Sequence, residues 1–236
     1  MLIPLLIAIS FSAGFFIESI IGFGGGLIAY SFLGFFMDIK QMVLAGLYIG
    51  TCASTYIVIT DHKSFNKQAF ISALPTCFLG TIVGVFIFSK LSSQAMLLTF
   101  GILAITLSVK VIFFDHLKFP RIFRSSLLAI GGVSHGLFGI GGPFVVNALK
   151  DEFKNKSELR TTMAAFFVTL NIFRFIQLIM QNEIHSELFA QIWWVIFPIF
   201  IAIYFGFKAH LKISEAFFKR LIGAMTFFAG IVFLLK

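Results

Sequence analysis

The chain carries the same glycine cluster twice, each time within a long hydrophobic stretch. Residues 22–26 have the sequence GFGGG, and residues 139–143, 117 positions later, have the sequence GIGGP. One titratable residue precedes each cluster by the same distance, Glu18 in the first copy and His135 in the second. A motif repeated half a chain length apart indicates two copies of one unit. Glycines that break a helix inside a bilayer must be buried in protein or line a cavity, and matching breaks in two halves point to a transporter's binding site.

The composition is that of a protein embedded in lipid. Hydrophobic residues make up 59% of the chain and charged residues 12%, and the mean hydropathy is +1.01. A soluble domain has about 25% charged residues. Outside the glycine stretches 2–37 and 125–149, six apolar runs approach the ~20 residues that a spanning helix needs: 41–60, 68–89, 94–114, 162–180, 190–207 and 216–235. The sequence therefore predicts an all-α polytopic membrane protein.

Loop charges predict how the two glycine stretches are arranged. If each stretch crossed the bilayer once, the loops of the two faces would hold 10 and 7 Lys and Arg residues. If each stretch entered and returned to the same face, the loops would hold 14 and 3. Cytoplasmic loops carry an excess of Lys and Arg. We therefore expect two glycine-broken hairpins, with both termini outside the cytoplasm.

Each half of the predicted architecture is a glycine-broken hairpin segment plus three transmembrane helices. Because three crossings are an odd number, the second half begins on the face opposite to the first, and the halves form two inverted repeats. The boundary falls in a basic loop. It gives an N-terminal membrane repeat, residues 1–118, and a C-terminal membrane repeat, residues 119–236.

A short helix is expected to start at each glycine cluster. The first turn of a helix presents unpaired N–H groups and the positive end of the helix dipole, so it binds an anion without a charged side chain. Two such starts, one from each half, would meet near the midplane. The alternative is that the glycines only let helices approach closely. The predicted substrate-binding positions are Gly24, Gly25, Gly26, Gly141, Gly142 and Pro143, the last a residue favoured in a first helical turn.

Arg174 is the only basic residue deep within a predicted span. It shares one polar face of a helix with Asn171, Gln177 and Gln181, because these positions lie three or four residues apart. A buried guanidinium marks a functional site or a paired charge, and its planar fork matches two oxygens of an oxyanion. Asn171 and Arg174 are therefore candidate anion ligands. The alternative is that Arg174 extends to the nearer interface or pairs with Glu18.

Glu18 and His135 are the candidate proton carriers, because a carboxylate and an imidazole inside a membrane are suited to proton relay. Each has a structural alternative: an ion pair or a hydrogen bond for Glu18, and a hydrogen bond within the hairpin for His135. Ser134 and Asn147 could donate hydrogen bonds to a ligand or could only hold helices together.

The segments 13–27 (AGFFIESIIGFGGGL) and 132–143 (GVSHGLFGIGGP) resemble the TauE/SafE sulfite exporter family, also called TSUP or DUF81. The resemblance extends over the whole chain through its length, hydropathy and doubled glycine signature. It departs from the family at 28–32, where members often have a proline. The resemblance implies a multi-pass transporter of the bacterial inner membrane for small sulfur-containing anions such as sulfite, thiosulfate or organosulfonates (sulfoacetate).

The expected function is thus secondary transport of a small anion by alternating access, with protons as the candidate coupling partner. The rival is an uncoupled anion channel or uniporter of the same fold, and a structural protein comes third. An enzyme is disfavoured because adjacent Ser134 and His135 do not face each other on one helix. No cofactor, no metal site and no nucleic-acid partner is expected, since the basic residues lie in short loops. The oligomeric state is open.

Overall fold

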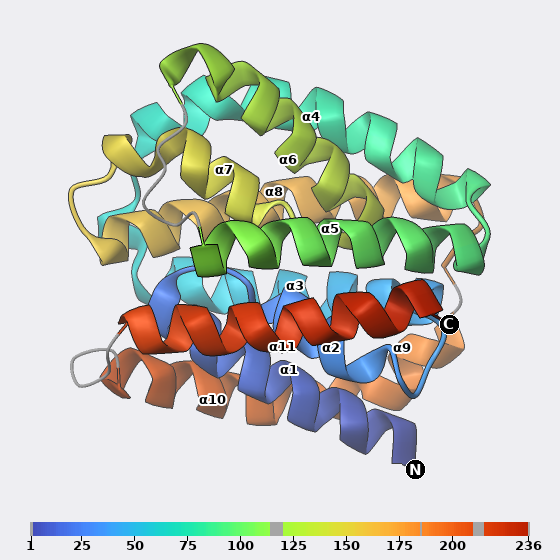
Figure 1. The fold of residues 1–236 in the computed structure, drawn as a ribbon. Coiled ribbons are helices and arrows are strands. Elements are labelled where there is room, and N and C mark those ends of the chain that lie inside the picture. The colour runs from blue at the N-terminus through green and yellow to red at the C-terminus, as the bar shows by residue number, and fades with distance from the viewer. Residues whose placement is uncertain (1, 114–119, 185, 210–214, 236) are drawn as a thin grey trace.

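The computed structural model describes residues 2–113, 120–184, 186–209 and 215–235. The structure is 89% helical, and the described residues form no strand. The helices lie side by side as one bundle (Figure 1). The prediction of an all-α polytopic architecture is therefore confirmed.

Six segments of the described chain are long and apolar enough to span a bilayer: Leu2–Ile20, Ile39–Thr60, Lys67–Lys90, Ser93–Phe113, Lys156–Met180 and Glu187–Ala209. Five of them correspond to predicted runs, namely α3 (Ile39–Thr60), α4 (Lys67–Lys90), α5 (Ser93–Phe113), α8 (Lys156–Met180) and the pair α9 (Ser186–Ile192) and α10 (Ile196–Ala209). The sixth lies in the first glycine stretch. The last predicted run forms α11 (Glu215–Leu235), in which Thr226–Leu235 is a shorter apolar helix.

The helix breaks at both glycine clusters. α1 (Leu2–Ile21) is followed by the short α2 (Gly25–Leu33), and α6 (Arg124–Phe138) by the short α7 (Gly142–Leu149). Gly22 and Gly139, which occupy the same position in the two clusters, have φ of 101° and 73°. This left-handed region is costly for a side chain but not for glycine. Each short helix packs back against its long partner, so both breaks form hairpins.

Helix packing follows the correspondence of the two halves (Figure 1). α4 packs on α6 as α10 packs on α1, while α3 lies against α8 and α5 against α11. α3 and α8 begin alike, because the side chains of Asp38 and Asn155, 117 positions apart, cap their first turns. This pairing supports two related units. Their inversion stays a prediction, and the proposed boundary at 118 and 119 lies outside the described residues.

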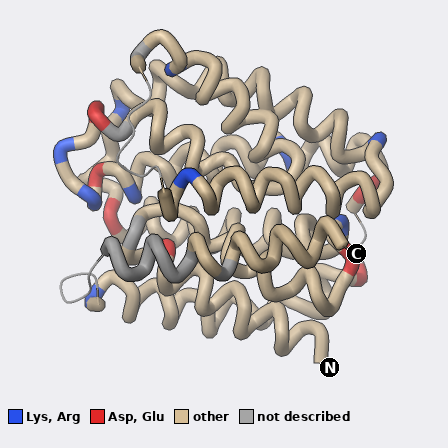
Figure 2. The backbone as a smooth tube through the Cα atoms, viewed as in Figure 1, with Lys and Arg blue, Asp and Glu red and all other residues tan. Residues whose placement is uncertain are grey.

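The two ends of the bundle differ in charge. Figures 1 and 2 place both ends of the chain at one end of the bundle, and Figure 2 shows most Lys and Arg residues at the opposite end. This distribution is the one that two returning hairpins require. Which end faces the cytoplasm stays a prediction.

A polar cluster at the end of α3 ties it to the start of α8. Oδ2 of Asp61 accepts hydrogen bonds from Arg160 Nη2 at 2.8 Å and Thr161 Oγ1 at 3.0 Å, and also from Ser157 Oγ. Oδ1 of Asp61 accepts from Ser64 Oγ at 2.7 Å. Partial burial alone would raise the pKa of Asp61, but these hydrogen bonds outweigh it and hold that pKa below its usual value.

This cluster predicts a pH-dependent stability. Because the pKa of Asp61 is lowered by folding, its carboxylate stabilises the protein above its unfolded-state pKa of about 3.9, and this contribution is lost as pH falls through the lower folded-state pKa. Asp61→Asn should cost about 1–3 kcal/mol at pH 7, measured as a lower Tm in detergent. Below about pH 4 the difference from wild type should shrink.

Glu187 provides a matched control for this variant, since it is an exposed carboxylate on α9. Glu187→Gln should lower Tm at pH 7 far less than Asp61→Asn, because the Glu187 side chain is exposed. An Asp61→Asn penalty that is the same at pH 7 and pH 3.5 would contradict the role assigned to the ionised carboxylate.

Candidate functional site

The two glycine clusters contact each other in the folded chain. A Cβ placed on Gly142 would lie 3.1 Å from Cβ of Phe23, and one placed on Gly26 would lie 3.7 Å from Cγ1 of Ile140. Phe23 and Ile140 are the apolar residues in the middle of the two clusters. Each therefore packs on the helix start of the other cluster, which brings α2 and α7 together.

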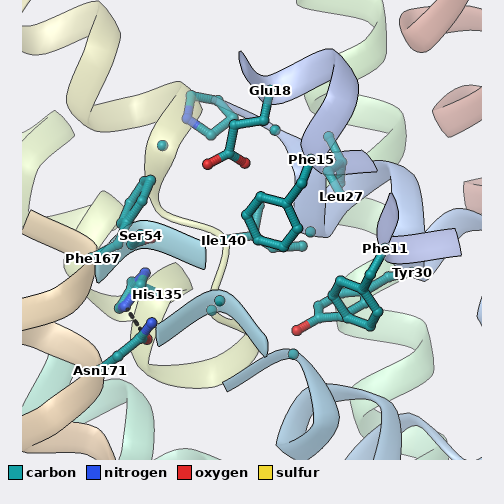
Figure 3. A pocket seen from close by; sticks show the side chains of 17 residues that line it. Phe11, Phe15, Glu18, Leu27, Tyr30, Ser54, His135, Ile140, Phe167 and Asn171 are labelled. Atoms are coloured by element: carbon teal, nitrogen blue, oxygen red, sulfur yellow. Dashed lines mark hydrogen bonds between the residues drawn. The ribbon is translucent and has the colours of Figure 1, made fainter. Parts of the chain in front are cut away.

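A small cavity lies at this junction (Figure 3). It offers about 40 Å³ to the centres of water-sized molecules, where one water needs roughly 10–15 Å³ on the same measure. Its volume therefore suits a few waters or one small ion. α1, α2, α3, α6 and α8 each contribute one polar side chain: Glu18, Tyr30, Ser54, His135 and Asn171. The rest of the lining is apolar or glycine: Phe11, Phe15, Gly24, Gly26, Leu27, Gly46, Gly50, Gly139, Ile140, Gly142, Pro143 and Phe167.

The side chain of Glu18, a residue of α1, lies at the start of α2. Its side chain is 6% exposed, and its Oε2 accepts a hydrogen bond from the backbone N–H of Gly25 at 2.7 Å. A carboxylate at this position also interacts favourably with the positive end of the α2 dipole. The first of the two helix starts considered for a substrate anion is therefore already occupied by a carboxyl group of the chain itself.

His135 stands in the matching place before α7 but makes a different contact. Its Nε2 lies 3.0 Å from Oδ1 of Asn171, and its ring stacks on Phe167 with centroids 5.3 Å apart. Its Nδ1 is buried and has no hydrogen-bond partner. Figure 3 shows His135 and Asn171 joined on one side of the cavity. No side chain of the described residues caps the start of α7, whose Gly142 and Pro143 line the cavity.

Arg174 is fully buried behind the second break and does not line the cavity. Its Nε donates to the carbonyl of Gly136 at 2.8 Å and its Nη2 to that of Leu137 at 3.4 Å. Two N–H groups therefore satisfy the negative end of α6. Nη1 has no partner, and it lies 3.2 Å from where a Cβ on Gly139 would be. In the structure Arg174 thus binds the end of a helix and forms no ion pair with Glu18.

Most of the predicted site residues gather at the cavity. Glu18, Gly24, Gly26, His135, Gly142, Pro143 and Asn171 line it, while Gly25, Gly141 and Arg174 lie directly behind this lining. Ser134 and Asn147 are bound elsewhere: Ser134 Oγ donates to the carbonyl of Ile140 at 2.6 Å, and Asn147 Nδ2 donates to that of Pro143 at 2.7 Å.

Tyr30 and Ser54 line the cavity but are absent from the residues singled out as ligands. The repeat spacing contains the signal for both. Adding 117 to Ser54 gives Asn171, a candidate ligand, and adding 117 to Tyr30 gives Asn147, a polar residue of the second short helix. The aromatic lining residues of α1, Phe11 and Phe15, follow no such spacing, because their place in the cavity depends on how α1 packs against α2.

The contact between Glu18 and Gly25 predicts a specific loss of stability. Glu18→Ala should leave the N–H of Gly25 without its partner and cost about 0.5–2 kcal/mol, measured as a lower Tm in detergent. Glu18→Gln keeps an acceptor oxygen at the same place and should lose less. Equal Tm values for wild type and Glu18→Ala would show that the carboxylate does not stabilise the α2 start.

The family model of the sulfite exporter TauE/SafE family matches residues 6–233, nearly the whole chain. The matched region includes both glycine clusters and every residue that lines the cavity. No curated protein and no solved structure matches the chain.

Proposed function

Because the chain belongs to the sulfite exporter TauE/SafE family, we propose that it carries small sulfur oxyanions or organosulfonates through the cavity between its two glycine breaks. The family is one of membrane transporters, so the chain is a multi-pass membrane transporter and not an enzyme. Sulfite, thiosulfate and sulfoacetate define the proposed substrate class. A small anion is the partner that the family implies.

The observation that carries this proposal is a difference in capping between the starts of the two short helices. Glu18 caps the start of α2, whereas the start of α7 opens on the cavity with no side-chain cap among the described residues. At this start Pro143 has no N–H and the N–H of Phe144 donates to the carbonyl of Gly141 at 3.2 Å, so the N–H of Gly142 and the positive end of the α7 dipole are what favour an anion there. The anion of the proposal therefore sits at Gly142 and Pro143, beside Asn171 and His135.

The surroundings favour a compact anion at this point. The positive charge of Arg174 is fully buried behind Gly139, and the described residues place no acidic side chain in an ion pair with it. An unpaired charge in a low-dielectric interior is costly, and an anion in the adjacent cavity would offset that cost. Glu18 on the opposite wall would repel the same anion when it is ionised, which couples anion entry to the charge of Glu18.

Alternating access is the proposed mode of transport. The two hairpins touch through Phe23 and Ile140, each packed on the other's helix start. A relative movement of the repeats would separate these contacts and open the cavity to one face at a time, as in transporters whose site lies between two repeats. Glu18 and His135 are the candidate proton carriers because both face the cavity.

Ligand binding tests the site directly. Sulfite or thiosulfate should raise the Tm of the purified protein, because a ligand that binds only the folded state stabilises it. Asn171→Ala should remove most of that shift. Thr169→Ala is the matched control on α8, since the Thr169 hydroxyl only bonds the carbonyl of Ala165. No shift of the wild-type Tm with any sulfur anion, together with no transport in proteoliposomes, would refute the proposal.

Proton coupling is tested in proteoliposomes with an imposed pH gradient. Coupled transport should drive anion accumulation against its concentration gradient, and Glu18→Gln should leave only downhill flux. A wild-type protein that equilibrates the anion but never accumulates it would instead be an uncoupled channel or uniporter, and neither Glu18 nor His135 would then carry a proton in the cycle.

A further inference from the structure

Tyr30 is a buried aromatic residue of α2 whose ring is fixed by packing. It is 2% exposed, and its ring lies between those of Phe11 and Phe100, with centroid distances of 5.9 Å and 6.0 Å. Phe11 comes from α1 and Phe100 from α5. Three helices thus hold the ring in one orientation, which also fixes where its hydroxyl points.

The Tyr30 hydroxyl occupies the space that a side chain at position 46, a glycine, would fill. A Cβ on Gly46 of α3 would overlap the hydroxyl oxygen. Any residue larger than glycine at position 46 would therefore displace it. In Figure 3 the hydroxyl points toward the interior of the cavity, from the side away from Glu18.

The same hydroxyl faces the turn behind which Arg174 is buried. A Cβ placed on Gly139 would lie 3.6 Å from the Tyr30 hydroxyl oxygen and 3.2 Å from Arg174 Nη1. Tyr30 and Gly139 line the cavity, whereas Arg174 does not. Nη1 is the one guanidinium nitrogen of Arg174 without a hydrogen-bond partner. The hydroxyl of the first half and the guanidinium of the second therefore meet at one glycine turn.

We propose that Tyr30 is a specificity-determining residue that contacts the transported oxyanion, with Arg174 as a positioning residue that acts through it. A tyrosine hydroxyl donates one hydrogen bond and accepts others. In the anion-bound state its O–H donates to an oxygen of the anion at the α7 start, and its oxygen accepts from Nη1–H of Arg174, which has no partner in the structure without the anion. The buried charge thereby polarises the O–H and strengthens its bond to the anion. This inference rests on the proposed function.

A fixed donor at this place selects by shape. An oxyanion has several oxygens, so one can bond the α7 start while another reaches the Tyr30 hydroxyl. Chloride is a single sphere and cannot bridge the two. Sites built to hydrogen-bond a group discriminate strongly against ligands that lack it, because their own polar groups are then left unpaired. Tyr30 should therefore contribute to oxyanion affinity and little to chloride affinity.

Tyr30→Phe is the decisive variant, because it removes the hydroxyl and keeps the packed ring. Its dissociation constants for sulfite and thiosulfate should rise about tenfold or more, as expected for the loss of a hydrogen bond to a charged group. The constant for chloride should change less than about twofold, within the scatter of such measurements. Tyr56→Phe is the matched control: Tyr56 stacks on Phe200 at 4.7 Å and does not line the cavity, so its anion affinities should equal those of wild type.

A double-mutant cycle separates the positioning role of Arg174 from its role in capping α6. If Arg174 acts through Tyr30, Arg174→Lys should weaken sulfite binding in wild type and much less in Tyr30→Phe. If Arg174 only caps α6, the two losses add, and this outcome would overturn the positioning role.

The outcomes also distinguish this inference from the proposed function. An unchanged sulfite constant in Tyr30→Phe, with weakened binding in Asn171→Ala, overturns the role of Tyr30 and leaves the substrate site intact. An equal loss of chloride and sulfite affinity in Tyr30→Phe overturns the specificity claim. Failure of the wild-type protein to bind or transport any sulfur oxyanion overturns both proposals.

Discussion

Backbone groups at helix ends inside a bilayer need partners from the protein, because lipid offers none. The two glycine breaks create such ends at the centre of this molecule. At the end of α1 the carbonyl of Ser19 lies 3.5 Å from Arg160 Nη1, and at the end of α6 the matching carbonyl of Gly136 accepts from Arg174 Nε at 2.8 Å. Both arginines belong to α8. One helix thus provides hydrogen-bond donors for the ends of both broken helices, and Glu18 provides an acceptor for the start of α2.

The starts of both short helices line the cavity, and the start of α7 is the one without a side-chain cap among the described residues. Its difference from the start of α2 comes from two pairs of positions, since Glu18 corresponds to His135 and Gly26 corresponds to Pro143, which has no N–H. A carboxylate folds back on the amide of Gly25, whereas the imidazole turns to Asn171. Two similar scaffolds therefore carry different chemistry: the start of α2 is capped by Glu18, and the start of α7 has no side-chain cap among the described residues.

Close helix packing keeps this arrangement in place. α4 and α6 touch backbone to backbone, since a Cβ on Gly80 would lie 3.0 Å from Cα of Gly132 and one on Gly84 would lie 2.8 Å from Cα of Gly136. In membranes, where no hydrophobic force drives helices together, such small-residue contacts supply much of the association energy. They fix α6, and with it His135 and the carbonyls that Arg174 binds.

Hydropathy and run length are enough to predict a helical bundle in lipid, and the doubled glycine cluster is enough to locate both breaks. The fixed spacing also paired Glu18 with His135. The contacts that these residues make are visible only in the folded chain. Whether Glu18 caps a helix, whether Arg174 binds carbonyls or a carboxylate, and whether Tyr30 reaches the cavity all depend on which helices pack together, since each contact joins residues from different helices or across a break. The local sequence pattern predicts where helices begin and end. The partners of each side chain depend on distances between helices, and the spacing of residues along the sequence does not contain these distances.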